Sequence, residues 1–300
     1  MFRRAFLAAT AATFIAPALA RAVQANTQTR TIEMDKKSSG LAPINGQELY
    51  YDVRGTGRPL IVLHGGLGAH DMFGPILDQL AATRQVIGVD LQGHGRTANT
   101  DRPMSYEAMA DDIAKLAAYL KLDKPDLFGY SMGGGVALRA AIDHGEAFGR
   151  IVLVSTPYGQ SGWTEANRQG MGQLGAAAAE AMKNTPMYQL YAAVAPRVED
   201  WPVLLTKMGQ FMGRDYDWSE EVKTITNPVM LVVGDADSVR LAHTAHFFEL
   251  LGGGIADGGW DGSGMTRHRL AVLPGVTHYQ IFMLPEMVEL SVPFLDAKQA

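Results

Sequence analysis

Residues 129–133 read Gly-Tyr-Ser-Met-Gly, a G-x-S-x-G motif with Ser131 at its centre. An apolar run, 127–129, leads into the motif, and a helical pattern beginning at Gly134 follows it. In this context the serine lies on a sharp turn between a strand and a helix, where small flanking residues let the backbone close. The spacing therefore predicts that Ser131 is a nucleophile.

A serine hydroxyl becomes a good nucleophile only when a neighbouring base removes its proton. Among the eight histidines, His278 follows the apolar run 270–273 through a Pro-Gly turn. Ligands of open α/β sheets gather beyond the carboxyl ends of the strands. His278 is expected at the same sheet edge as Ser131, and we assign it as the base.

The base in turn needs a carboxylate that orients its ring. The apolar run 229–233 is followed by Gly-Asp-Ala-Asp, which offers Asp235 and Asp237. The run 151–154 ends in Ser155-Thr156, without a carboxylate. Both acids lie beyond the last apolar residue of their strand, so strand alternation does not decide between them.

The elements that would position these residues follow a regular rhythm. Short apolar runs alternate with helical patterns, and Asn45-Gly46 is typical of a tight hairpin turn. Continuous apolar strands alternating with helices indicate a parallel sheet covered on both faces. The fold class expected is α/β with a mostly parallel, doubly wound sheet. The expected strands are 48–54, 60–63, 86–89, 127–129, 151–154, 229–233 and 270–273, and the clearest helices are 105–120, 132–144 and 239–251.

One interval, 158–225, breaks this rhythm and carries helical pieces interrupted by prolines. We predict that it forms a helical cap or lid inserted after the sixth strand, between core segments 43–157 and 226–296. Its methionines and aromatic residues would suit an adaptable apolar pocket, although packing of the lid on the core would explain them equally well.

The chain begins with Arg3-Arg4, an apolar stretch over 5–15 and an Ala-Leu-Ala sequence at 18–20. This order is typical of an export signal, of the general or the twin-arginine type. We expect residues 1–22 to be the signal, residues 23–42 to form a flexible leader, and the protein to be periplasmic or secreted.

Composition narrows the possible functions of the 300-residue chain. Its 26 basic and 31 acidic residues give a net charge of −5, which argues against nucleic acid as a partner. The absence of cysteine excludes disulfides, zinc–thiolate sites and a cysteine nucleophile. No apolar run is long enough for a membrane span. We expect neither a metal nor another cofactor, and the oligomeric state stays open.

From about residue 43 to residue 295 the chain resembles the α/β-hydrolase superfamily, in its lidded, serine-triad, esterase-like branch. The resemblance rests on His64-Gly65-Gly66, on Asp-Leu-Gln-Gly-His-Gly-Arg at 90–96, and on the motif at 129–133. It also rests on Gly234-x-x-Asp237 and on the chain order Ser, Asp, His. The resemblance implies that Asp237 is the acid and that Asp235 caps a turn or is solvated.

The same resemblance implies an oxyanion hole made by the backbone amides of Met132 and Gly66, with Leu67 as the alternative to Gly66. It implies that His64 braces the turn after its strand. Leu67 and Tyr130, which flank these groups, are expected to contact the substrate.

The activity implied is hydrolysis of a carboxylic ester with an apolar or aromatic group, through an acyl-enzyme. Lactonase, perhydrolase or haloperoxidase-like and carbon–carbon bond hydrolase activities use the same three residues and stay open. A serine at position 131 counts against haloalkane dehalogenases and epoxide hydrolases, in which this position is an aspartate. A ligand receptor without activity is the remote alternative.

Overall fold

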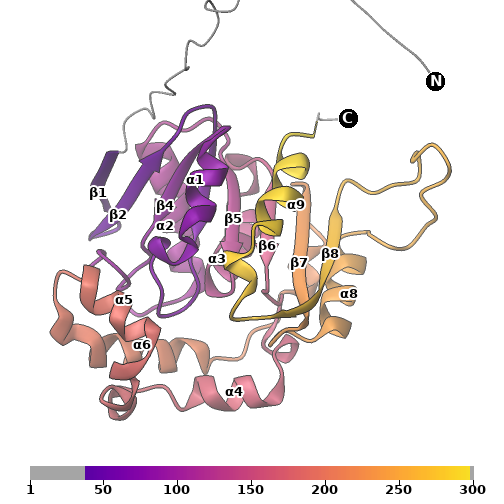
Figure 1. Cartoon of the computed structure of the whole chain (residues 1–300). Helices are drawn as coiled ribbons and strands as arrows, with labels where there is room; N and C mark the ends of the chain where they lie inside the picture. Colours follow the sequence, from indigo (N-terminus) through magenta and orange to yellow (C-terminus); the bar gives the residue numbers. More distant parts are fainter. Residues whose placement is uncertain (1–37, 298–300) are drawn as a thin grey trace, which may run out of the picture. The chain divides into compact units, whose positions relative to one another are not determined.

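A computed structural model describes residues 38–297, and in it eight strands form one sheet (Figure 1). The strand order is β1-β2-β4-β3-β5-β6-β7-β8. β1 and β2 are antiparallel, β2 runs antiparallel to β4, and all other neighbours are parallel. The strands are β1 Ser38–Ile44, β2 Gln47–Arg54, β3 Arg58–Leu63, β4 Arg84–Val89, β5 Asp126–Tyr130, β6 Ile151–Val154, β7 Val229–Ala236 and β8 Arg269–Thr277.

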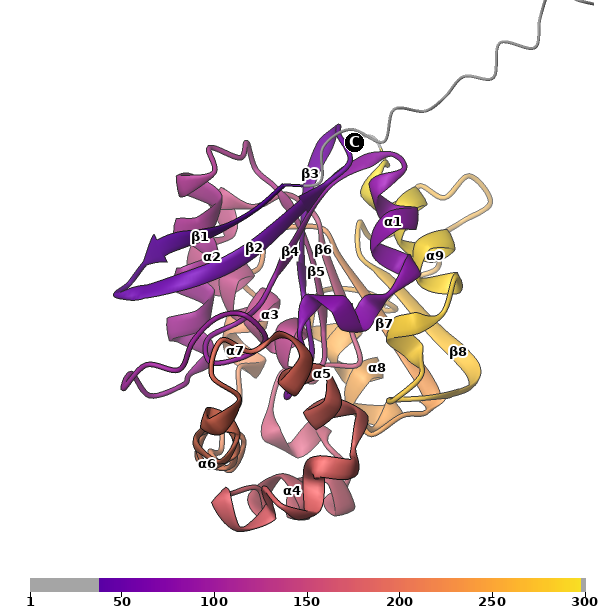
Figure 2. The same ribbon diagram turned by 60° about the vertical axis from the view of Figure 1, so that its left-hand side comes forward.

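Helices cover both faces of this sheet, as Figures 1 and 2 show. α1 and α9 share an apolar cluster with one set of strand residues, and α2, α3 and α8 share another cluster with the alternate set. The predicted mostly parallel, doubly wound α/β architecture is thereby confirmed. The helices are α1 Pro75–Ala81, α2 Tyr106–Tyr119, α3 Met132–His144, α4 Glu165–Gly172, α5 Pro186–Val194, α6 Trp201–Met212, α7 Ser219–Val222, α8 Leu241–Leu250 and α9 Glu286–Leu295.

The first hairpin has the turn that the sequence predicts. Asn45 and Gly46 have φ values of 50° and 77°, and Ile44 pairs with Gln47 across the turn. β1 begins at Ser38, however, so the expectation that the leader extends to residue 42 is wrong for residues 38–42. Pairing with β2 holds these residues in the sheet. The expected export signal, 1–22, lies outside the described residues.

The segment between β6 and β7 contains α4 to α7 and no named strand. Its helix α6 lies close to the loop that follows β4, because Lys207 Nζ donates hydrogen bonds to the carbonyl oxygens of Thr100 and Arg102. None of the helices within residues 38–297 has the length and apolar character needed to cross a membrane.

Candidate active site

Ser131 lies at the turn between β5 and α3, with φ 52° and ψ −117°. This strained backbone depends on the two motif glycines. A Cβ on Gly129 would lie 2.3 Å from the Gly133 carbonyl oxygen, and one on Gly133 would lie 2.4 Å from the Leu63 carbonyl oxygen. Because backbone atoms cannot move aside cheaply, only glycine fits at either position.

Three of the predicted residues come together at this turn. His278 Nε2 lies 3.1 Å from Ser131 Oγ, and His278 Nδ1 lies 2.8 Å from Asp237 Oδ1. Ser131 and His278 are 7% and 6% exposed. A neutral imidazole protonated on Nδ1 donates to the carboxylate and accepts from the serine hydroxyl, which is the arrangement needed to remove the serine proton.

The two candidate acids have different surroundings. Asp237 Oδ2 accepts a hydrogen bond of 2.5 Å from Ser155 Oγ, and its Oδ1 also accepts one of 3.0 Å from the Val239 amide. Burial alone would raise the pKa of Asp237, but hydrogen bonds from His278 and Ser155, together with electrostatic attraction to His278, lower it below its ordinary value. Asp235 is exposed and accepts a hydrogen bond from the Gly275 amide, so it braces a turn.

The expected oxyanion donors border the same turn. Met132 is the first residue of α3, so its amide has no acceptor within the helix. A Cβ on Gly65 would lie 3.4 Å from Ser131 Cβ, which places the turn containing Gly66 against the serine. Leu67 has φ 58° and is buried in the apolar cluster that also contains Met132.

The side chain of Tyr130, predicted to contact the substrate, is buried beside the site, and a Cβ on Gly65 would lie 2.7 Å from its ring. Its hydroxyl donates a hydrogen bond of 2.7 Å to the His278 carbonyl oxygen. Its ring packs against Phe282 in the apolar cluster on the α1 and α9 face. Tyr130 therefore supports the loop that carries His278.

Only some of the apolar residues between β6 and β7 contact the site. Met208 Cε lies 2.9 Å, and Met212 Sδ 3.8 Å, from where a Cβ on Gly66 would be. The ring of Trp163 lies edge to face against His278, with centroids 5.6 Å apart. Other aromatic residues of this segment pack on the core or on each other, among them Tyr188, Tyr191, Trp201, Phe211 and Trp218.

The remaining sequence motifs build the support around the site. His64 Nε2 accepts a hydrogen bond from the Leu91 amide, and His64 Nδ1 lies 2.7 Å from the Gly65 carbonyl oxygen, so this residue braces the turn as predicted. Burial lowers the pKa of His94 to about 3, which keeps its ring neutral at neutral pH.

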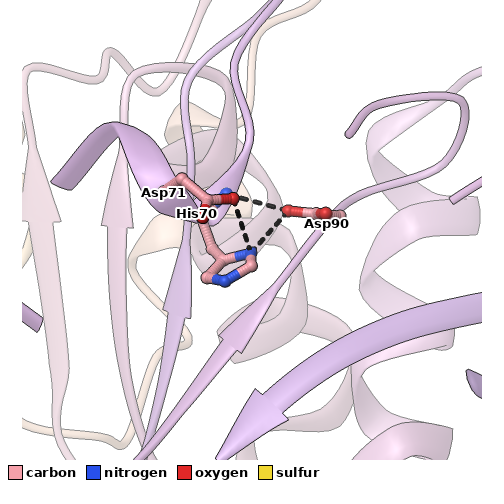
Figure 3. A group of neighbouring side chains, drawn as sticks. All are labelled: His70, Asp71 and Asp90. Atoms are coloured by element: carbon pink, nitrogen blue, oxygen red, sulfur yellow. Dashed lines mark hydrogen bonds and ion pairs between the residues drawn. The ribbon is translucent and has the colours of Figure 1, made fainter. Parts of the chain in front are cut away.

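A cluster of His70, Asp71 and Asp90 has potential metal-ligand atoms within 4.8 Å of one another (Figure 3). Arg96 forms ion pairs with both carboxylates. Asp90 also accepts hydrogen bonds from the amides of His70 and Arg96. The Arg96 guanidinium thus already neutralises the two carboxylates, as a metal ion would do. The hydrogen bonds of the cluster connect two adjoining turns and stabilise them.

A cavity of about 580 Å³ lies elsewhere, between the end of α8 and the start of β8. The glycine-rich loop after α8 forms much of its wall, with Phe248, Met265 and His268. Its lining includes none of the residues that surround Ser131.

Comparisons with known proteins agree with this architecture. The sequence model described as alpha/beta hydrolase fold matches residues 58–253. The AB hydrolase superfamily protein YisY of Bacillus subtilis is 36% identical over 109 residues, 36% of this chain and 41% of that protein. The 2-hydroxymuconate semialdehyde hydrolase of Pseudomonas sp. (strain CF600) is 33% identical over 106 residues, 34% of this chain and 38% of that protein.

The chain therefore spans less than half the length of these two curated relatives. Among solved structures, E-2-(acetamidomethylene)succinate hydrolase superimposes with a TM-score of 0.68 at 21% identity. That superposition covers 87% of this chain and 100% of the other. At this identity the similarity establishes the fold.

Proposed function

The chain belongs to the α/β-hydrolase fold family, and on that premise we propose that it is a serine hydrolase of carboxylic esters with an apolar acyl or alcohol group. The main support for the proposal is the hydrogen-bonded triad of Ser131, His278 and Asp237. His278 lies 3.1 Å from Ser131 Oγ and 2.8 Å from Asp237 Oδ1. Such a triad activates a serine hydroxyl without a metal or an organic cofactor.

In the first half of the proposed reaction, His278 Nε2 takes the Ser131 proton while Oγ attacks the ester carbonyl carbon. The charge that develops on the carbonyl oxygen is stabilised by the amides of Met132 and Gly66. His278 then returns the proton to the departing alcohol, which leaves an acyl group on Ser131. Asp237 keeps the imidazole in the required tautomer and stabilises the imidazolium.

In the second half, His278 removes a proton from a water molecule that attacks the acyl carbonyl carbon. The tetrahedral intermediate collapses, His278 returns the proton to Ser131 Oγ, and the carboxylic acid leaves. Each group is used twice, so the same three side chains serve acylation and deacylation.

We propose an apolar group in the substrate because methionine side chains lie next to the expected oxyanion turn. Met208 and Met212 of α6 reach Gly66, and a carbonyl oxygen bound to the Gly66 amide would bring the substrate against their thioether side chains. Flexible, polarisable methionines form apolar walls that adapt to shape. We accordingly assign the α4–α7 segment as the lid.

A substrate panel with covalent labelling tests the proposal. The panel contains p-nitrophenyl esters of rising acyl length, a lactone and a vinylogous 1,5-diketone, and a fluorophosphonate is used separately. Ester hydrolysis with a burst of p-nitrophenol, together with labelling at Ser131, is expected. Labelling at Ser131 with turnover of only the lactone or the diketone would replace the ester by that substrate class. No labelling and no turnover would favour the receptor without activity.

The position of Met208 leads to a prediction about chain length. Met208→Ala should raise kcat/KM for octanoyl relative to acetyl esters by about tenfold, because removal of the side chain opens space for several methylenes. The ratio is measured with purified variants after thermal unfolding shows that they are folded.

The control for this prediction is Met187→Ala, at a 37% exposed position on α5, which should leave the ratio as in the parent. Met212→Ala, at a partly buried position, serves if Met208→Ala does not fold. A parental ratio in a folded Met208→Ala or Met212→Ala variant would contradict the assignment.

A further inference from the structure

We propose that Ser155 is a positioning residue for the reaction, whose hydroxyl holds the Asp237 carboxylate with Oδ1 facing His278. The inference rests on the proposed function of Ser131, His278 and Asp237. It starts from the hydrogen bond of 2.5 Å that Ser155 Oγ donates to Asp237 Oδ2.

Ser155 belongs to a row of residues delivered by neighbouring strands. β5, β6, β7 and β8 are adjacent in the sheet. Ser131 is the first residue after β5, and Ser155 is the first after β6. In the same way, Asp237 follows β7 and His278 follows β8. Since the ends of parallel strands meet at one edge of a sheet, the residue after β6 lies between the nucleophile and the acid.

Ser155 is buried and has a strained backbone conformation. Ser155 has φ 51°, close to the 52° of Ser131, and its amide donates to the Val232 carbonyl oxygen at 2.8 Å. It is 0% exposed. Burial of a hydroxyl away from water is unfavourable unless the hydroxyl forms a hydrogen bond, and the Asp237 carboxylate accepts this one. The strained backbone is a further cost, which the surrounding structure must support.

The distribution of donors on Asp237 explains why the Ser155 hydroxyl matters. Oδ1 accepts from His278 Nδ1 and from the Val239 amide. On Oδ2 the only other donor, among the residues described, is the Gly234 amide at 3.4 Å. Without Ser155 the carboxylate could rotate about its Cβ–Cγ bond, and Oδ1 would spend less time in line with the imidazole.

A double-mutant cycle between Ser155→Ala and Asp237→Asn tests the inference. The measured quantities are the rate constant for fluorophosphonate labelling of Ser131, and kcat and KM on the best ester of the panel. Ser155→Ala should lower the labelling rate and kcat by about 10- to 100-fold, the range for a hydrogen bond to a charged group. KM should change by less than about twofold, because Ser155 acts through Asp237.

In the Asp237→Asn background the same change should cost less than about twofold, because the carboxylate through which Ser155 acts is gone. Equal losses in both backgrounds would show that Ser155 supports the fold and would overturn the inference. Ser155→Gly removes the hydroxyl and also relieves the positive φ, so it should lose as much activity as Ser155→Ala. A parental labelling rate in Ser155→Gly would show that backbone strain, and not loss of the hydroxyl, slows Ser155→Ala. That result would also overturn the inference.

A matched control is Ser291→Ala on α9, where the buried hydroxyl has no partner in the described part of the chain. It should keep the parental labelling rate. If the parent protein is not labelled at Ser131, the proposed function fails and this inference fails with it. If the parent is labelled and the Ser155 variants react at the parental rate, only the role of Ser155 is disproved.

Discussion

Ser131→Ala is expected to lower kcat by about 10⁴- to 10⁶-fold while the protein stays folded. Alanine retains the Cβ, so the strain at φ 52° is unchanged. The Ser131 amide still donates to the Val154 carbonyl oxygen at 2.9 Å. What is lost is the oxygen that His278 activates. The measurements are kcat on one ester and the thermal unfolding temperature of parent and variant.

Covalent labelling gives the outcome that would contradict this assignment. A fluorophosphonate should modify the parent at Ser131, identified by mass spectrometry of the labelled peptide, and should leave Ser131→Ala unmodified. Labelling of a different serine in both proteins, or parental kcat in the folded variant, would show that another residue is the nucleophile.

Local signals made part of this structure predictable from the sequence. Asn45-Gly46 predicts the first hairpin because few residue pairs accept positive φ at both positions. The glycines around Ser131 predict the turn because the neighbouring backbone leaves no room for a Cβ. The hairpin and the contact between Gly129 and Gly133 involve only a few neighbouring residues, so a short stretch of sequence contains these constraints. The Leu63 carbonyl oxygen that excludes a Cβ at Gly133 lies much earlier in the chain.

The direction of Tyr130 could not be predicted in this way. β5 is buried on both faces, so alternation of polar and apolar residues does not show which face a side chain joins. The Tyr130 hydroxyl bonds to the backbone of His278, 148 positions later in the chain. Contacts between residues so distant in sequence depend on the completed sheet.

The choice between Asp235 and Asp237, and the contact of Ser155, depend on a local irregularity of the sheet. The register between β7 and β8 shifts between Gly234 and Ala236, and such a bulge re-aims the side chains that follow it. Beyond it, Asp237 faces Ser155 and His278. A serine after a strand belongs to no motif, so only the assembled strand ends show its partner.

Asp237→Asn is expected to lower kcat by about 10²- to 10⁴-fold without unfolding the protein. The amide is nearly the same size as the carboxylate, but its NH₂ group can face His278 Nδ1 and favour the wrong tautomer. In serine proteases, the same exchange of the orienting aspartate for asparagine lowers kcat by about 10⁴. The variant also loses the negative charge that stabilises the imidazolium while Ser131 reacts.

Asp235→Asn is the matched control, two residues away in the same turn. Its carboxylate is exposed and accepts one hydrogen bond, from the Gly275 amide, which the asparagine oxygen can also accept. Its kcat should fall by no more than about threefold, since surface substitutions outside special features have small effects. Both variants are compared on one ester after circular dichroism has shown that they are folded. A folded Asp235→Asn variant with the larger loss would mean that the acid of the reaction is Asp235, and that the hydrogen bond between Asp237 and His278 is structural.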